Sequence, residues 1–252
     1  MTATLPAAAF GAVEVRDAAT VLLVRDGERG LEVAMLRRRL ESGFVPGAYV
    51  FPGGALDAED RDPRWGDRCD GHDDVSASAV LGTADGGLAY WVAAIRECFE
   101  EAGLLLARRA DGGALGVDVD PGTAERFARH RAGVDAGRVD LLDVVAEEDL
   151  VLPVGDLHYF ARWITPEPAP RRYDTRFFVG RAPADQVLRH DGDETIAALW
   201  ARPADALARF AAGDFELIRP TEHSLEILND YPDADAVLAA AAARPLGMET
   251  FS

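Results

Sequence analysis

The first quarter of the chain alternates short apolar runs with polar turns. Residues 18–26 (AATVLLVRD) and 31–38 (LEVAMLRR) are rich in β-formers and flank the turn GERG, which predicts a β-hairpin. Residues 47–57 (GAYVFPGGALD) predict a strand that ends in a Pro-Gly-Gly loop. Residues 60–87 are polar, with Gly and Asp throughout, and we interpret them as a surface insertion.

Longer helical patterns follow the polar segment. Apolar residues between positions 89 and 107 recur at helical spacing and predict one long helix. Shorter helices are expected at 121–133 and 139–148, strands at 157–165, 174–183 and 194–202, and helices at 203–213, 221–230 and 233–244. Strands before and after a central helix predict an α/β (or α+β) fold in which helices pack on a mixed sheet.

Composition narrows the possible functions. A length of 252 residues with 48% hydrophobic content suits one elaborated domain with a sizeable core. The net charge of −18 argues against binding to nucleic acid backbones. All basic residues are arginines, which excludes a Schiff-base or Walker-type lysine. Cys69 and Cys98 are too few for a disulfide framework or a structural zinc site.

The sequence also sets expectations about location and assembly. The first residues lack the pattern of a secretory signal, and no apolar run is long enough to cross a bilayer, so we expect a cytoplasmic protein without a membrane partner. The C-terminal helices carry a set of apolar residues that pack either on the domain, which we favour, or on a second copy in a homodimer. These residues are Leu225, Ile227, Leu228, Val237 and Leu238.

The central helix carries an unusual group of acidic residues. Glu97, Glu100 and Glu101 are spaced i, i+3, i+4, which places them on one face of an α-helix. Like charges at this spacing repel each other, and a hard divalent cation such as Mg²⁺ offsets that repulsion through carboxylate oxygens. A solvated acidic face is the alternative interpretation. Upstream, the glycine loop offers a backbone carbonyl as a further metal ligand.

This helix resembles part of a known family motif. Residues 96–104 (RECFEEAGL) match the second half of the Nudix box, R-E-U-x-E-E-x-G-U with U apolar, at every defined position. Its first half, G-x5-E, resembles the stretch from Gly54 to Asp60, with Glu59 as an alternative shifted by one residue. Residues 61–95 separate Asp60 from Arg96, a spacer much longer than that of the usual box.

The resemblance implies a fold and an activity. We expect a Nudix-type α/β/α sandwich over residues 17–205, with a 61–88 insertion in the box, a helical insertion at 108–150, and a C-terminal helical extension at 206–252 packed on the same domain. It also implies Mg²⁺- or Mn²⁺-dependent hydrolysis of a nucleoside diphosphate linked to another group.

The resemblance also implies roles for individual residues. The metal ligands would be Glu97, Glu100, Glu101 and the carbonyl of Gly53 or Gly54. Arg96 would pair with an upstream acid, with Asp60 as a candidate, and fix the loop against the helix.

The general base stays open at this point. Glu97 and Glu101 on the helix are candidates, and so is Glu194, where a later strand begins in an acidic loop. An exposed loop acid without a catalytic role is the alternative for Glu194.

The substrate is narrowed by a further resemblance. Residues 37–62 are similar to the long-insertion branch of the peroxisomal coenzyme A diphosphatase group of Nudix proteins. Arg37, Arg38 and Arg39 would then meet a phosphate or the adenosine, or else form an exposed basic strand end. Phe51 and Gly54 are also expected to contact the substrate. An ADP-ribose or NADH pyrophosphatase and a nucleotide-sensing module without catalysis are the alternatives.

Overall fold

The computed structural model describes residues 13–41, 46–113 and 115–247. Its strands are β1 (Val15–Gly27), β2 (Gly30–Arg38), β3 (Tyr49–Val50), β4 (Gly53–Ala55), β5 (Arg108–Arg109), β6 (Leu150–Val151), β7 (His158–Ile164), β8 (Arg172–Arg181) and β9 (Thr195–Ala201). Its α-helices are α1 (Asp74–Leu81), α2 (Leu88–Glu97), α3 (Pro121–Asp135), α4 (Leu141–Glu147), α5 (Pro203–Ala211), α6 (Arg219–Leu228) and α7 (Ala234–Ala243). Short 3₁₀ segments lie at Glu59–Arg61, Pro63–Asp67 and Val154–Asp156, and a π-helical turn spans Cys98–Ala102.

One mixed sheet forms the centre of the molecule. Its order is β3-β2-β1-β8-β7, with β4 paired to β1 and β9 paired to β2. β1 and β8 are parallel, and the other pairs in this sheet are antiparallel. β1 pairs with β2 through its second half and with β4 through its first half. The predicted hairpin and mixed sheet are confirmed.

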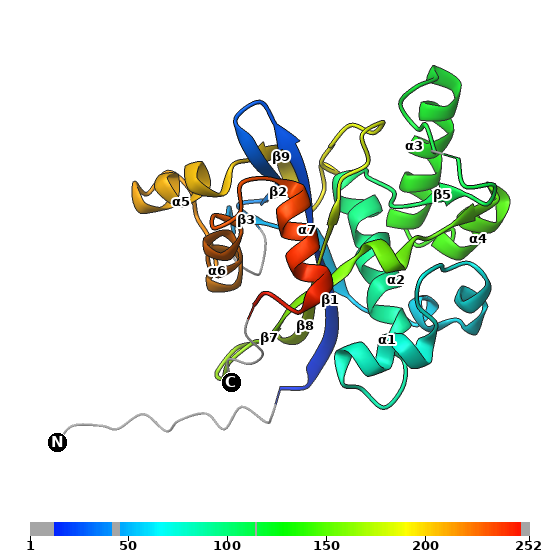
Figure 1. The fold of residues 1–252 in the computed structure, drawn as a ribbon, viewed down its shortest axis with the longest axis horizontal. Coiled ribbons are helices and arrows are strands. Elements are labelled where there is room, and N and C mark those ends of the chain that lie inside the picture. The colour runs from blue at the N-terminus through cyan, green and yellow to red at the C-terminus, as the bar shows by residue number, and fades with distance from the viewer. Residues whose placement is uncertain (1–12, 42–45, 114, 248–252) are drawn as a thin grey trace.

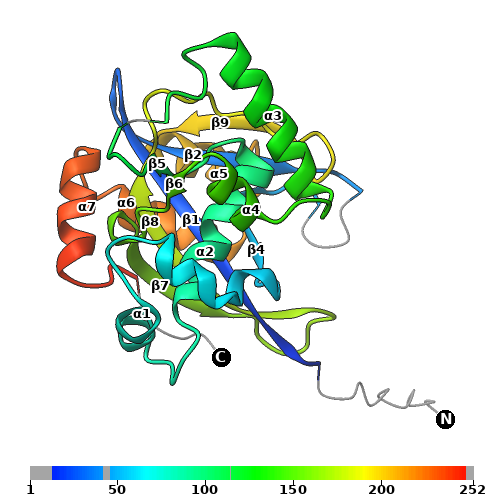
Figure 2. The ribbon, with the colours of Figure 1, turned by 90° about the vertical axis from the view of Figure 1, so that its right-hand side faces the viewer.

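Helices cover both faces of this sheet (Figure 1). Because successive side chains of a strand point to opposite faces, β1 contributes to two cores. Val21 and Leu23 belong to the core beneath α2, whereas Leu22 and Val24 belong to the core beneath α6 and α7. Figure 2 looks onto the α2 side, where α2 crosses β1. The predicted α/β/α arrangement is confirmed.

The structure corrects two sequence predictions. The central helix does not reach residue 107: its π turn ends at Ala102, and Gly103 has a φ of +69°, a left-handed conformation that stops the helix. The predicted strand at 47–57 is divided into β3 and β4, because Pro52 lies between them and cannot donate a ladder hydrogen bond.

The polar segment at 60–87 is mostly at the surface, but it is folded and contributes a few buried side chains. Trp65 is only 2% exposed and packs in the core with α2. The Asp74 carboxylate at the start of α1 accepts the backbone N–H groups of Gly86 (3.0 Å) and Leu88 (3.1 Å), and so caps the first turn of α2. A segment whose composition predicts a polar surface insertion therefore supports the acidic helix.

The C-terminal helices pack on the sheet. Leu225, Leu228 and Val237 are buried, and Ile227 and Leu238 pack against the same core. None of the helices within the described residues is both long and apolar enough to cross a membrane. The first twelve residues, on which the prediction of no secretory signal rests, lie outside the described residues.

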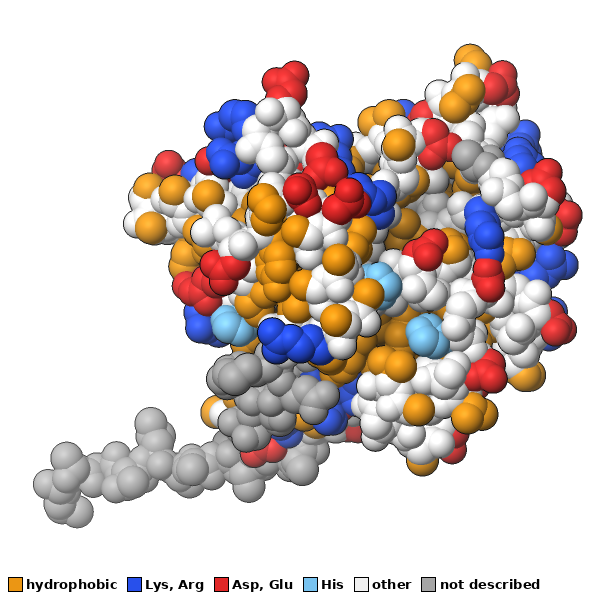
Figure 3. All heavy atoms as spheres, in the orientation of Figure 1, with side chains coloured by type: hydrophobic (Ala, Val, Ile, Leu, Met, Phe, Trp, Pro, Cys, Tyr) orange, Lys and Arg blue, Asp and Glu red, His pale blue; other side chains and the backbone are white. Residues whose placement is uncertain are grey.

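On the face in Figure 3, basic side chains lie singly or in small groups among acidic ones.

Candidate active site

The acidic residues lie where α2 passes into the π turn. Each residue of a π turn advances less around the axis than in an α-helix, because the turn contains more residues. Glu101 therefore stays in line with Glu97, and both line one cavity. Glu100 is rotated toward Arg96 and accepts a hydrogen bond from its Nη1 at 3.2 Å. Single π turns are frequent at functional sites.

The glycine loop touches the glutamates. A Cβ atom on Gly53 would lie 2.4 Å from Thr20 Oγ1, and one on Gly54 would lie 2.5 Å from Glu97 Oε1, so neither position has room for a side chain. The backbone N–H of Gly53 donates to Glu101 Oε2 at 3.0 Å. The two glycines thus bring main-chain atoms into direct contact with the carboxylates.

Arg96 joins the loop to the helix. Its Nε and Nη2 each donate to one oxygen of Asp60 at 2.9 Å, a bidentate pair, and Nη2 also donates to the carbonyl of Ala55 at 2.9 Å. Asp60 is buried and Glu59 is exposed, so Asp60 is the upstream partner, and the expected pairing of Arg96 with that residue is confirmed. Although burial alone would lower the pKa of Arg96, hydrogen bonding to Asp60 and the neighbouring glutamate charges raise it.

A negative charge on Glu97 or Glu101 is only partly compensated by the surrounding protein. Burial raises the pKa of Glu97 to about 8; Arg96 opposes this shift and Glu100 adds to it. Burial also raises the pKa of Glu101 well above its usual value, and repulsion by Glu97 adds to the shift. The hydrogen bond from the Gly53 N–H lowers the pKa of Glu101 but does not cancel this rise. Two carboxylates held in this way favour a bound cation.

The donor set suits a small divalent ion. Within residues 13–41, 46–113 and 115–247, no group of three or more His, Cys, Asp or Glu side chains forms a ready ligand cage. Mg²⁺ is usually bound through one or two carboxylates, with water and substrate phosphates completing its shell. The pair Glu97 and Glu101 fits this pattern, and Mn²⁺ accepts the same oxygen ligands. Glu100 does not line the cavity, and its predicted ligand role stays a prediction.

The cavity beside the glutamates has a volume of about 640 Å³, which falls within the ordinary range for small-molecule sites, about 300–1,000 Å³. Its walls come from β1, the glycine loop, the β7–β8 hairpin and the start of α6. The lining residues are Ala18, Thr20, Arg38, Val50, Phe51, Gly53, Gly54, Ala55, Glu97, Glu101, Trp163, Ile164, Thr165, Pro166, Arg171, Tyr173, Thr175, Phe177, Glu194, Ile218, Arg219, Pro220 and Thr221. Acidic, basic and aromatic side chains thus share one cavity.

The three consecutive arginines of the first hairpin have different positions. Arg38 lines the cavity, and its charge lowers the pKa of Glu101. The Arg37 guanidinium lies 5.7 Å from the centre of the Tyr49 ring. Arg39 donates through Nη1 to the carbonyls of Gly192 (3.2 Å) and Asp193 (3.1 Å). Neither Arg37 nor Arg39 lines the cavity.

A hydrogen-bonded loop presents Glu194 to the cavity. The Asp191 carboxylate accepts the backbone N–H groups of residues 193–195, and the Glu194 carbonyl accepts the N–H of Arg39 at 3.1 Å. In the described part of the chain the Glu194 carboxylate has no hydrogen-bond partner. Its charge contributes to the raised pKa of Glu101.

Sequence reasoning missed much of the cavity wall, including the part formed by the start of α6. Arg219 and Thr221 come from the start of α6, beyond the part of the chain that the motif covers. The only sequence signal was the run LIRPTEHSLEIL, which resembles the long-insertion branch but does not reveal that α6 folds back over the site.

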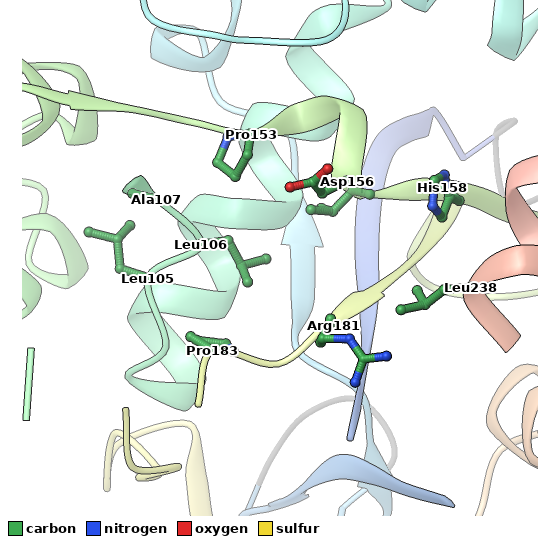
Figure 4. Close-up of a pocket in the computed structure, with 10 residues that line it drawn as sticks. Leu105, Leu106, Ala107, Pro153, Asp156, His158, Arg181, Pro183 and Leu238 are labelled. Carbon is green, nitrogen blue, oxygen red and sulfur yellow. The ribbon is translucent and has the colours of Figure 1, made fainter. Parts of the chain in front are cut away.

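A second cavity of about 410 Å³ lies between the segment after Gly103, the β7–β8 sheet edge and α7 (Figure 4). Leu105, Leu106 and Leu238 form apolar parts of its wall, with Asp156 and Arg181 among the polar ones. None of the acidic-helix glutamates contributes to it. The candidate chemistry therefore lies in the larger cavity.

The structure thus combines a mixed sheet between helical layers with a buried carboxylate pair that lies against a glycine loop in the wall of a cavity. Comparison with known proteins shows the family: residues 77–227 match the model of the NUDT19 Nudix domain, and the chain belongs to the Nudix hydrolase family. Members of this family generally use divalent metal ions.

Individual relatives agree with this assignment. Acyl-coenzyme A diphosphatase NUDT19 of Homo sapiens is 28% identical over 80% of this chain, and that of Gallus gallus is 28% identical over 83%. The matched regions span 61% and 67% of the length of these two relatives. The crystal structure of a NUDIX hydrolase from Alicyclobacillus acidocaldarius superposes with a TM-score of 0.79 at 30% identity, covering 94% of this chain and all of that one.

Proposed function

We propose that this protein hydrolyses the diphosphate linkage of a nucleoside diphosphate derivative, with coenzyme A or an acyl-coenzyme A as substrate. The observation that carries the proposal is the pair of buried glutamates, Glu97 and Glu101, in the wall of a ligand-sized cavity beside Gly53 and Gly54. The similarity to proteins named acyl-coenzyme A diphosphatases supports the choice of substrate.

The protein groups of the site have separate roles. Glu97 and Glu101 would hold Mg²⁺ or Mn²⁺, together with a main-chain oxygen of the glycine loop. Such an ion neutralises phosphate oxygens and makes a bound water more acidic. Arg38 lies in the wall near Glu101 and offers a fork of donors to a phosphate. Arg96 holds Glu97 in place and does not reach the cavity.

Glu194 is the best-placed general base. Its carboxylate lines the cavity, has no hydrogen-bond partner within the described residues, and is presented by a loop that Asp191 and Arg39 hold in place. Glu97, by contrast, accepts a hydrogen bond from Arg96 Nη1 at 3.0 Å, and Glu101 accepts one from Gly53. A free carboxylate is available to take a proton from water, whereas these two are already engaged.

The remaining wall suits the rest of an acyl-coenzyme A molecule. Phe51, Trp163 and Phe177 give the cavity aromatic surface, against which an uncharged arm would pack. Arg171 and Arg219 lie in the same wall and would attract a further phosphate. A ligand that joins several phosphates to a long apolar arm matches both kinds of surface.

The test is a product analysis with Mg²⁺ or Mn²⁺ present. Coenzyme A, an acyl-coenzyme A, ADP-ribose and NADH are incubated separately, and the products are identified by mass. The proposal predicts 3′,5′-ADP and a phosphopantetheine fragment from the first two. Faster turnover of ADP-ribose or NADH would contradict the substrate assignment, and no hydrolysis of any of the four would contradict the proposed activity.

A further inference from the structure

The π turn that carries the glutamates ends with carbonyl groups that have no partner within the helix. A helix leaves its last carbonyls without intrahelical donors. Here the last main-chain donors of the turn are the N–H groups of Gly103, which binds the Phe99 carbonyl, and Leu104, which binds the Cys98 carbonyl. The carbonyls of Glu100, Glu101 and Ala102 need donors from elsewhere.

Arg131 of α3 supplies donors to two of these carbonyls. Its Nε donates to the Glu100 carbonyl at 2.9 Å, and its Nη2 donates to the Glu101 carbonyl at 3.1 Å. A cation at this end of a helix also interacts favourably with the helix dipole. Gly103 leaves space for the guanidinium, because a Cβ atom there would lie 2.8 Å from Arg131 Nη1.

The same guanidinium reaches the segment that leads to Glu194. Nη2 of Arg131 also donates to the carbonyl of Arg189 at 2.9 Å, and the N–H of Arg189 donates to the Ala102 carbonyl at 2.9 Å. Nearby, Gln186 exchanges two hydrogen bonds of 2.8 Å with the backbone of Leu105. The turn and this segment are therefore joined at several points, and the Arg131 side chain contacts both.

We propose that Arg131 is a positioning residue of the active site, which holds the metal-binding turn of Glu101 and the segment leading to Glu194 in a fixed relation. This inference rests on the proposed function, which makes the cavity beside Glu97 and Glu101 the active site. It also gives the helical insertion at 108–150 a role, because α3 brings a cation to the end of the acidic helix. Arg131 does not line the cavity, so it acts through the backbone of the residues that do.

The experiment compares Arg131→Ala and Arg131→Lys with the parent in the full chain. Binding of Mn²⁺ is measured without substrate, by calorimetry or by the loss of the free-ion signal in electron paramagnetic resonance. We expect Arg131→Ala to raise the dissociation constant for Mn²⁺ by at least tenfold. Arg131→Lys should restore part of the affinity, because an ammonium group reaches a carbonyl but lacks the planar fork. Arg129→Ala is the matched control, since Arg129 lies on the same helix and is exposed.

Turnover provides the second measurement. At saturating Mn²⁺, Arg131→Ala should lower kcat at least tenfold and leave KM within about threefold, because the substrate-lining side chains are unchanged. Should the alanine variant not fold, Arg131→Lys alone decides, and it should weaken Mn²⁺ binding at least threefold.

Parent-like Mn²⁺ affinity in a folded Arg131 variant would overturn this inference without affecting the proposed function. A parent protein that binds Mn²⁺ but hydrolyses no diphosphate would overturn the proposed function. The Mn²⁺ affinities of the Arg131 variants would then still decide whether Arg131 positions the metal-binding turn. A parent protein that does not bind Mn²⁺ would overturn both.

Discussion

Two groups of buried charge lie next to each other at the end of α2, and they are neutralised in different ways. In the first, Arg96 and Asp60 form a bidentate pair with both hydrogen bonds at 2.9 Å. In the second, burial raises the pKa of Glu97 and of Glu101, repulsion by Glu97 adds to the shift of Glu101, and the nearby Arg96, Arg38 and Gly53 donors do not offset these shifts. The paired group holds the loop to the helix. The poorly compensated carboxylates of Glu97 and Glu101 face a cavity, where a bound cation would neutralise them.

The largest effect on stability is expected from breaking the pair of Arg96 and Asp60. Arg96→Ala leaves Asp60 buried without its partner, so the free energy of unfolding should fall by about 3–5 kcal/mol. Denaturation in urea measures this change. The exposed control Arg129→Ala should stay within about 0.5 kcal/mol of the parent. A loss below about 1 kcal/mol for Arg96→Ala would show that the pair does not hold the fold.

Glu101→Gln should lower activity strongly without lowering stability. Turnover should fall about 10³-fold, which corresponds to about 4 kcal/mol of transition-state stabilisation. The free energy of unfolding without metal should be unchanged or higher, because the amide removes a buried charge that its neighbour repels. Steady-state kinetics and urea denaturation test the two parts, with the exposed Glu147→Gln as the control. Turnover within tenfold of the parent would contradict the assignment of Glu101.

Metal binding should stabilise the folded protein through the second group. At a concentration of Mg²⁺ or Mn²⁺ one hundred times the dissociation constant, the free energy of unfolding should rise by about 2.7 kcal/mol. Thermal denaturation with and without a chelator measures the rise. Glu97→Gln and Glu101→Gln should each lose most of it, whereas Glu147→Gln should keep it. An equal rise in all variants would place the ion elsewhere.

Glu100→Gln should have the smallest effect of the acidic helix. Glu100 accepts a hydrogen bond from Arg96 and does not line the cavity. The Glu100→Gln variant should therefore keep a turnover at least tenfold higher than that of Glu101→Gln. Parallel measurement of kcat/KM for the two glutamine variants separates them. Equal losses would show that Glu100 also reaches the metal, as the family resemblance implies.

Much of the fold could be predicted from local patterns. The β1–β2 hairpin follows from apolar runs around a glycine turn, and α5, α6 and α7 lie within about two residues of their predicted bounds. The end of the acidic helix was missed because Leu104 and its apolar neighbours fit a helix and a buried extended segment equally well. Only the left-handed Gly103 decides between them.

The candidate site was predictable where a single helix carries it and less so where distant segments meet. The i, i+4 spacing of Glu97 and Glu101 predicted that they share one face of the helix. The π turn that rotates Glu100 away is not visible in spacing alone. The roles of Arg39 and Arg131 were missed, because their acceptors are backbone carbonyls on remote segments and leave no trace in the sequence.

The most direct test of the account is a crystal structure of the protein soaked with Mn²⁺, with the ion located from its anomalous signal. We expect a peak between the carboxylates of Glu97 and Glu101, beside the glycine loop, and its disappearance in Glu101→Gln. A peak at another site, or none between these two carboxylates at saturating Mn²⁺, would contradict the central claim.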